Sequence, residues 1–352
     1  MVREDRAAVP QEDNGRSADG VSGQVAKPSA QKDCNERKGV NMTFGTVFTN
    51  WDATHSAQWG HQPLRLSHEL HKSPLFSRDA LAELIQRYPR EHYSLIQTGP
   101  KDGKKVWREG EIGSFNGEQV MRAIAGGGLW LMLRDVGTID AAYYAMIERM
   151  LREVGAYVPG FETRTHQESL LVSSPDAVVP YHADLPGQAL IQLVGRKRVY
   201  VYPNTPPFIT PEQLEDIAIF NYELDLPYQP WFDDHAEVFD IGPGEMLSWE
   251  LNAPHRVENL DSFSVSMTVS YTTDEIRRRD VVNLANGLLR HRFGYTPKTR
   301  NLEGPSFLAK RVLQKLWRDS GWVKRERSAR RPTEFRLDAA EPGGIVELPR
   351  AA

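Results

Sequence analysis

The sequence predicts an α+β protein that is mainly β, with helices on either side of a β-rich centre. From Glu168 to Tyr271, short runs of β-forming residues alternate with turn residues, which is typical of antiparallel strands. Helical periodicity occupies the segments before and after this region. Evenly spaced short strands favour a double-stranded β-helix, the jelly-roll or cupin barrel, whose mouth is a natural ligand site.

The composition is that of a globular protein without cysteine-based sites. The chain has 352 residues, of which 40% are hydrophobic and 9% aromatic, so it can fold by burial alone. Its single cysteine, Cys34, excludes an intrachain disulfide framework and a Cys-based zinc site. No apolar run is long enough to cross a membrane and no signal region follows the N-terminus, so we expect a cytoplasmic protein.

We predict four segments along the chain. Residues 1–41 have almost no large apolar side chains and are expected to be disordered; Met42 opens the first segment of folded character, so a later translation start is considered. Residues 42–273 form the barrel domain with N-terminal helices, residues 274–322 are helical, and residues 323–352 form a loosely ordered tail.

Four helices are expected outside the strands. Ser77 is an N-cap candidate for a helix that begins at Arg78 and ends before Pro89. The others are expected at 141–151, 274–289 and 305–317. The last two have apolar stripes that we expect to pack on the barrel or on a second subunit: Leu284, Leu288, Leu289, Leu313 and Leu316.

One histidine–carboxylate pair, His182-x-Asp184, has a context that suggests a metal site. Side chains alternate along a strand, so two residues separated by one point to the same face and can bind one ion. His255 follows a glycine-rich turn and is expected on a strand across the barrel. Two imidazoles and one carboxylate leave positions open for a co-substrate and oxygen, which is typical of non-haem iron(II).

Two further pairs, His166-x-Glu168 and His235-x-Glu237, match the same short pattern. The pattern is common by chance because acidic residues are frequent. Neither pair is followed by a glycine turn and a lysine, so we interpret both as surface or structural residues.

Lys197 is the candidate cation for a buried co-substrate carboxylate, which would be costly without a charged partner. Gly195 allows the chain to turn between two strands, and Lys197 then opens the second strand. An alternative interpretation is that Arg196, Lys197 and Arg198 form a solvated basic hairpin tip.

Two blocks carry a family resemblance. Residues Val179–Asp184 and Ile191–Arg198, with Tyr202-Pro203 behind them, resemble the central motif of the JmjC (jumonji), cupin-like 2-oxoglutarate oxygenases. Residues Asp240–Glu245 and Pro254–Asn259 are similar to the second cupin motif. The resemblance implies that His182, Asp184 and His255 bind iron(II) and that Lys197 binds the C5 carboxylate of 2-oxoglutarate.

The chain departs from that family at Val179, where many members have a threonine that helps to bind the co-substrate. Tyr200, Tyr202 and Ser248 are candidate replacements for its hydroxyl, and we list Tyr202 and Gln192 beside Lys197 as co-substrate-binding residues. Asn259 is interpreted as part of a turn between two strands, with a role behind the metal ligands as the alternative.

Two segments have open interpretations. Residues 204–239 are rich in aromatic and acidic side chains and form either a substrate-binding loop or a plain excursion with its own small core. From Asp274 to Arg331 there are 16 Lys or Arg against 6 Asp or Glu. We interpret this charge as a solvated helical face rather than a nucleic-acid site, and the resemblance implies a possible homodimer through these helices.

The sequence therefore predicts an iron(II)- and 2-oxoglutarate-dependent hydroxylase that uses molecular oxygen on a small molecule or a protein side chain. One alternative is a non-catalytic cupin-like metal- or ligand-binding regulatory protein, which Val179 favours. Another is a metal-dependent cupin isomerase or dioxygenase that needs no keto acid, which Lys197 disfavours.

Overall fold

A computed structural model describes residues 46–98, 107–220, 226–260, 262–320, 332–341 and 344–349. The chain divides into two units, residues 1–44 and 45–352, and the described strands and helices belong to the second. The predicted disorder of residues 1–41 and the possible start at Met42 lie outside the described residues. No helix in the described ranges is both long and apolar enough to span a membrane.

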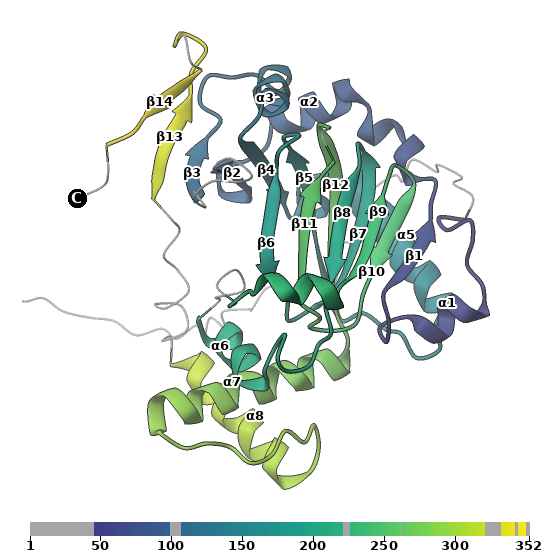
Figure 1. Ribbon diagram of the computed structural model, residues 1–352, viewed down its shortest axis with the longest axis vertical. Coiled ribbons are helices and arrows are strands. Elements are labelled where there is room, and N and C mark those ends of the chain that lie inside the picture. The colour runs from purple at the N-terminus through teal and green to yellow at the C-terminus, as the bar shows by residue number, and fades with distance from the viewer. Residues whose placement is uncertain are drawn as a thin grey trace, which may run out of the picture. The chain divides into compact units, whose positions relative to one another are not determined.

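Two β-sheets form the centre of the unit (Figure 1). The large sheet has the strand order β1-β10-β7-β12-β5-β4-β2-β3-β13-β14, and the small sheet has the order β6-β11-β8-β9. The large-sheet strands are β1 (Leu64–Ser67), β2 (Tyr93–Thr98), β3 (Trp107–Glu111), β4 (Leu129–Arg134), β5 (Thr165–Ser173), β7 (Gly187–Val194), β10 (Glu245–Ser248), β12 (Ser264–Thr272), β13 (Thr333–Leu337) and β14 (Ile345–Glu347). The small-sheet strands are β6 (Val178–His182), β8 (Lys197–Val201), β9 (Glu237–Ile241) and β11 (His255–Asn259).

The helices lie outside this pair of sheets. They are α1 (Ala53–Gln58), α2 (Arg78–Gln86), α3 (Gly117–Ala125), α4 (Val136–Ile139), α5 (Ala141–Tyr157), α6 (Pro211–Phe220), α7 (Asp274–Phe293) and α8 (Gly304–Asp319), with short 3-10 turns at Leu70–Lys72, Pro74–Phe76, Arg90–His92 and Pro230–His235. The mixed α+β class is confirmed, as are the predicted N-cap Ser77 of α2 and the helices at α5, α7 and α8.

The main hydrophobic core lies between the large sheet and the helices α2, α3 and α5. Ile147 and Val154 of α5 pack against the outer face of the sheet with Leu170 and Met267, and all four are almost fully buried. Each such side chain contributes roughly 1.5–3 kcal/mol relative to an exposed one. The large sheet is thereby held as a rigid support.

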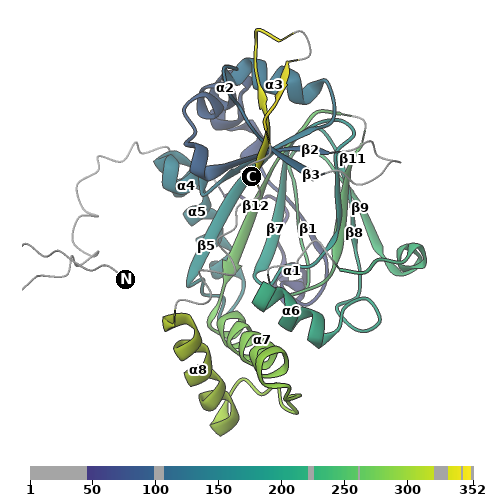
Figure 2. The ribbon, with the colours of Figure 1, turned by 90° about the vertical axis from the view of Figure 1, so that its left-hand side faces the viewer.

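The second face of the large sheet is turned towards the small sheet, as the side view shows (Figure 2). Leu190 and Leu247 of the large sheet pack there against Val199, Val201 and Val257 of the small sheet. We call the volume between these inward-facing side chains the inter-sheet space. It is the part of the fold into which β6, β8 and β11 direct every second side chain.

Gly195 makes the link between the two sheets possible. It joins β7 to β8 with a positive φ of 73°, and a Cβ there would lie 2.3 Å from the Phe263 carbonyl oxygen. Only glycine meets both conditions without strain. The turn predicted at this position is confirmed.

The segment after α8 differs from the loosely ordered tail expected for residues 323–352. Within its described part, β13 pairs in parallel with β3 and antiparallel with β14, extending the large sheet at its edge. Phe335 is fully buried, and its ring lies so close to Gly110 that a Cβ there would be 2.2 Å from it. Burial of the Phe335 ring holds β13 against the large sheet. The polar, Pro- and Gly-rich residues around it had predicted a loosely ordered tail instead.

Replacing Phe335 with alanine is expected to detach β13 and β14 and to lower the free energy of unfolding by about 3 kcal/mol, because a buried aromatic ring is removed. Chemical denaturation and limited proteolysis of the C-terminal segment measure both effects. Arg336→Ala, which changes a half-exposed neighbour, serves as the control. Equal protease resistance of the two variants would contradict the anchoring role of Phe335.

Candidate metal centre

Three predicted ligands come together at one end of the inter-sheet space. His182 is the last residue of β6, His255 is the first residue of β11, and the two are direct partners across the antiparallel pair. Asp184 follows two residues after His182. One ligand atom from each of the three lies within 4.8 Å of the others.

The elements that position two of the three ligands, Asp184 and His255, differ from those predicted from the sequence. Asp184 lies beyond the end of β6 rather than on the strand, so strand alternation does not place its carboxylate. Asn252 does so in part, because its side-chain nitrogen donates to the carbonyl oxygens of Asp184 and Leu185. His255 comes from the strand adjacent to β6 and not from across the barrel.

Backbone carbonyl groups orient both imidazole rings. Nδ1 of His182 lies 2.8 Å from the Pro180 oxygen, and Nδ1 of His255 lies 3.1 Å from the Ala253 oxygen. A carbonyl oxygen only accepts, so each Nδ1 carries the proton and each Nε2 keeps its lone pair for a metal. The Nε2 atom of His255 accordingly lies 3.4 Å from a carboxylate oxygen of Asp184.

Burial makes the His255 ring neutral and leaves the Asp184 carboxylate without compensation for its charge, and a bound cation complements both effects. The pKa of His255 is held well below its ordinary value by burial and by the nearby His182, so its ring is neutral. Burial also raises the pKa of the Asp184 carboxyl, which means that its negative charge is costly without a partner. Trp249 covers one side, with its ring centroid 4.5 Å from that of His255.

This donor set fits iron(II). Two neutral imidazole nitrogens and one carboxylate grouped on one side leave the remaining positions of an octahedral ion open. Thiolate ligands, which favour zinc or iron–sulfur clusters, are absent from the described residues around the site.

Lys197 lies at the opposite end of the same strands. It begins β8, is only 3% exposed, and sits between the exposed Arg196 and the partly exposed Arg198, whose guanidinium pairs with Asp240. The interpretation of all three as a solvated hairpin tip is therefore wrong for Lys197. Burial lowers the pKa of Lys197 to about 8, and no described residue forms a hydrogen bond or ion pair with its ammonium group.

Gln192 lies beside that end of the space and Tyr202 does not. Gln192 is fully buried on β7, and its amide nitrogen donates to the Val194 and Gly195 carbonyls and to the Ser264 hydroxyl. Tyr202 packs in an aromatic cluster on the outer face of the small sheet, where its hydroxyl donates to Asp233. The structure therefore does not bring Tyr202 to the Lys197 end of the inter-sheet space.

The other two proposed replacements for a threonine hydroxyl are also engaged elsewhere. The Tyr200 hydroxyl donates to Glu258, and the Ser248 hydroxyl donates to the Gln188 carbonyl. Val179 itself is half-buried and packs against apolar side chains between the sheets.

Asn259 belongs to β11 and not to a turn, so that interpretation is wrong. It is buried, is the direct partner of Lys197, and donates to the Ser173 hydroxyl and the Ser174 carbonyl on the large sheet. Asn259 thus connects the two sheets beside Lys197. The period-two pattern shared with His255 and Val257 was the signal for this placement.

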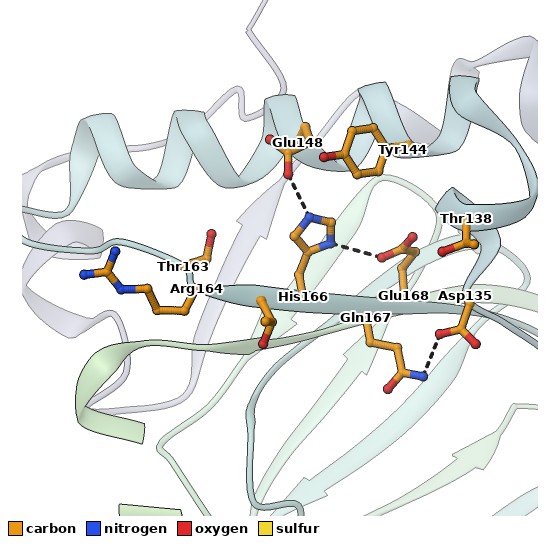
Figure 3. Close-up of a pocket in the computed structure, with 10 residues that line it drawn as sticks. Asp135, Thr138, Tyr144, Glu148, Thr163, Arg164, His166, Gln167 and Glu168 are labelled. Atoms are coloured by element: carbon orange, nitrogen blue, oxygen red, sulfur yellow. Dashed lines mark hydrogen bonds and ion pairs between the residues drawn. The ribbon is translucent and has the colours of Figure 1, made fainter. Parts of the chain in front are cut away.

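The two remaining histidine–carboxylate pairs lie away from the centre. His166 sits between Glu148 of α5 and Glu168 of β5 beside a polar cavity of about 420 Å³ (Figure 3). These two carboxylates raise the pKa of His166, Glu168 most of all. His235 is exposed, at the end of the 3-10 turn before β9.

Residues 204–239 include a small core of their own. Phe208 and Phe232 pack with Tyr181 and Tyr202 against the outer face of the small sheet, and Asp233 pairs with Arg256 of β11. This supports the interpretation as an excursion with its own core. Residues 221–225 lie outside the described part.

Fold and site together define a class: a mixed α+β protein with two facing sheets and a candidate two-histidine, one-carboxylate metal centre. No protein-family model matches the chain, and no curated protein matches it. Among solved structures, an X-ray structure of YcfD from Escherichia coli is 18% identical over 78% of this chain and 68% of that chain, with a TM-score of 0.46. YcfD, described as a ribosomal oxygenase, in complex with cobalt and 2-oxoglutarate is 17% identical over 84% and 75%, with a TM-score of 0.45.

A further structure of YcfD, with cobalt and succinic acid, is 15% identical over the same shares of the two chains, again with a TM-score of 0.45. Similarity this distant transfers no activity.

Substituting His182 with alanine is expected to weaken divalent metal binding by more than about 100-fold, because even groups that only support a ligand are worth 10–100-fold. Calorimetric titration with Mn²⁺, a redox-stable substitute for Fe²⁺, measures the affinity. His166→Ala is the matched control and is expected to bind as the wild type does. Equal loss in both variants would exclude this centre.

Lys197→Met is expected to stabilise the ligand-free protein by about 3 kcal/mol at most, because it removes a buried, unpaired charge while keeping an unbranched chain. The pKa of Lys197 is about 8 in the folded protein against an ordinary value of 10.5, so the cost of the buried charge is fully present below pH 8 and fades as pH rises towards 10.5. Chemical denaturation at pH 7 and at pH 10 measures the stability gain of Lys197→Met at each pH, with Arg196→Met as the control. A gain independent of pH would contradict this origin.

Proposed function

We propose that the protein is an iron(II)- and 2-oxoglutarate-dependent oxygenase, a hydroxylase of a small molecule or a protein side chain. The observation that carries the proposal is the triad His182, Asp184 and His255 at one end of an inter-sheet space whose other end contains a buried, unpaired lysine. The strand order supports a double-stranded β-helix, since β5 to β12 are shared between two facing sheets.

The spacing between the triad and Lys197 suits a short dicarboxylate. His255 is the partner of Val201 on β8, and Lys197 lies four residues earlier, which corresponds to roughly 13 Å along the strand. The side chain of Lys197 extends its ammonium group over part of the distance between its own backbone and the triad. A five-carbon keto acid that chelates a metal through its keto-acid end extends its far carboxylate into the remainder.

Each group has a separate task in this proposal. Iron(II), when bound, supplies oxygen activation coupled to conversion of 2-oxoglutarate into succinate and carbon dioxide and to hydroxylation of a substrate C–H bond. Lys197 neutralises the far carboxylate of the keto acid. Leu190, Val199 and Val257 keep water from the chemistry by lining the path between the two ends.

A non-catalytic cupin-like binding protein is the second candidate, and Val179 is the feature that favours it. Its apolar side chain contributes no hydroxyl to a co-substrate. The buried ammonium of Lys197 weighs against a third candidate, a keto-acid-independent isomerase or dioxygenase, because an unpaired buried charge is costly unless a ligand compensates for it.

Homodimerisation through the C-terminal helices remains a proposal. Leu316 of α8 is 65% exposed, with Leu308 and Val312 on the same face, whereas Leu288 of α7 is buried within the unit. The apolar stripes were expected to pack on the barrel or on a second subunit; α7 instead packs mainly on α6 and α8, and part of the α8 stripe is left on the surface.

Succinate formation from 2-oxoglutarate is expected to require Fe²⁺ and oxygen and to fall to background in Asp184→Ala, because the carboxylate ligand is removed. Uncoupled turnover without substrate provides a basal signal, and a metabolite and peptide screen for stimulated succinate release identifies the substrate class. Glu237→Ala, from an unrelated histidine–carboxylate pair, is the control. Wild-type levels of succinate in Asp184→Ala would overturn the metal assignment.

A further inference from the structure

A ring of polar side chains closes the inter-sheet space at the Lys197 end. Lys197 is the partner of Asn259, which donates to the Ser173 hydroxyl of β5. Ser173 is in turn the partner of Ser264 on β12, which accepts from the amide of Gln192. The Gly195 turn then returns the chain from β7 to β8 and Lys197.

Most of this ring is satisfied internally, which leaves few groups for a ligand. The amide nitrogens of Asn259 and Gln192 have acceptors on the protein. The hydroxyls of Ser173 and Ser264 each accept one of those bonds. These four side chains form a floor for the space and leave the Lys197 ammonium without a described partner.

Ser266 lies one step above that floor, towards the metal centre. It is on the same face of β12 as Ser264 and is the partner of Gln192 on β7. From Ser264 onwards β12 runs towards Tyr271, the partner of Gly187, which follows Asp184 closely in the chain. Ser266 therefore lies on the stretch between Lys197 and the triad.

The Ser266 hydroxyl is fully buried and forms no hydrogen bond with any described group, and the same is true of the Gln192 carbonyl oxygen next to it. Buried polar groups are paired in the great majority of proteins, because an unpaired one retains its full desolvation cost. A buried hydroxyl without a partner, on the stretch between the triad and the unpaired Lys197 ammonium, is a donor that a carboxylate in the inter-sheet space can accept from.

We propose that Ser266 of β12 and Lys197 of β8 together bind the far carboxylate of the keto acid, one from each sheet. This inference rests on the proposed function and assigns the hydroxyl that Val179 does not supply. Tyr200, Tyr202 and Ser248 are excluded from that role because each already donates elsewhere. The Ser266 hydroxyl donates to one carboxylate oxygen, and the Lys197 ammonium neutralises the charge.

The test is a binding experiment with the full chain loaded with Mn²⁺ under anaerobic conditions. Calorimetric titrations compare 2-oxoglutarate with pyruvate, a keto acid that has no far carboxylate. Ser266→Ala is expected to bind 2-oxoglutarate about 10-fold more weakly, the loss of one charge-assisted hydrogen bond, and to bind pyruvate as the wild type does. Thermal unfolding of the ligand-free variant is expected at or above the wild-type temperature, because the substitution removes an unpaired buried hydroxyl and no protein contact.

Ser248→Ala is the matched control, since it deletes another buried serine hydroxyl whose bond goes to a backbone carbonyl on the large sheet. It is expected to bind both keto acids normally. Unchanged 2-oxoglutarate affinity in Ser266→Ala, or equal losses for both keto acids, overturns the assignment of Ser266 alone. Failure of the metal-loaded wild type to bind 2-oxoglutarate overturns the proposed function and this inference with it.

Discussion

The position of β11 between β6 and β8 is the constraint on which the site depends. Its first residue, His255, is paired with His182 on one side, and its last residue, Asn259, is paired with Lys197 on the other. One five-residue strand thus fixes both the candidate metal end and the Lys197 end of the inter-sheet space. A register shift of one residue would turn His255 and Asn259 outward together, because side chains alternate with a period of two.

Two buried charged groups, Asp184 and Lys197, destabilise the ligand-free protein, so the fold that holds them needs a large hydrophobic core elsewhere. The raised pKa of Asp184 and the lowered pKa of Lys197 have the same cause, desolvation, and act on groups of opposite charge. Neither group relieves the other, because they lie at opposite ends of the strands. The core between the large sheet and its helices stabilises the unit sufficiently to hold both.

Strand alternation accounts for most of what the sequence could predict about the site. Applied to every strand, it would also have avoided two errors, the placement of Tyr202 at the co-substrate and of Asn259 in a turn. If Lys197 points inward on β8, then Val199 and Val201 do so as well and Tyr200 and Tyr202 point outward, which the parity of the numbers already implied. The same rule places Asn259 inward with His255. Asp184 was predicted correctly as a neighbour of His182 but for the wrong reason, since the strand ends at His182 and the contact to Asn252 is not visible in the spacing.

The β13 strand was missed because its stability comes from one ring, Phe335, packed on Gly110, a contact between segments that are distant in the sequence.

The outer face of the small sheet gives the long excursion at 204–239 a structural role in the site. Tyr181 precedes His182 on β6 and points outward, where its hydroxyl donates to the Phe208 carbonyl. Arg256 follows His255 on β11 and also points outward, where it pairs with Asp233. Each histidine ligand therefore has a chain neighbour that is bound to the excursion on the opposite face. Because a strand cannot rotate one side chain without moving the next, these outer contacts fix the direction of the imidazoles from behind. The excursion thus contributes to the metal centre through the backbone of the two strands, without any of its own residues having to reach the inter-sheet space.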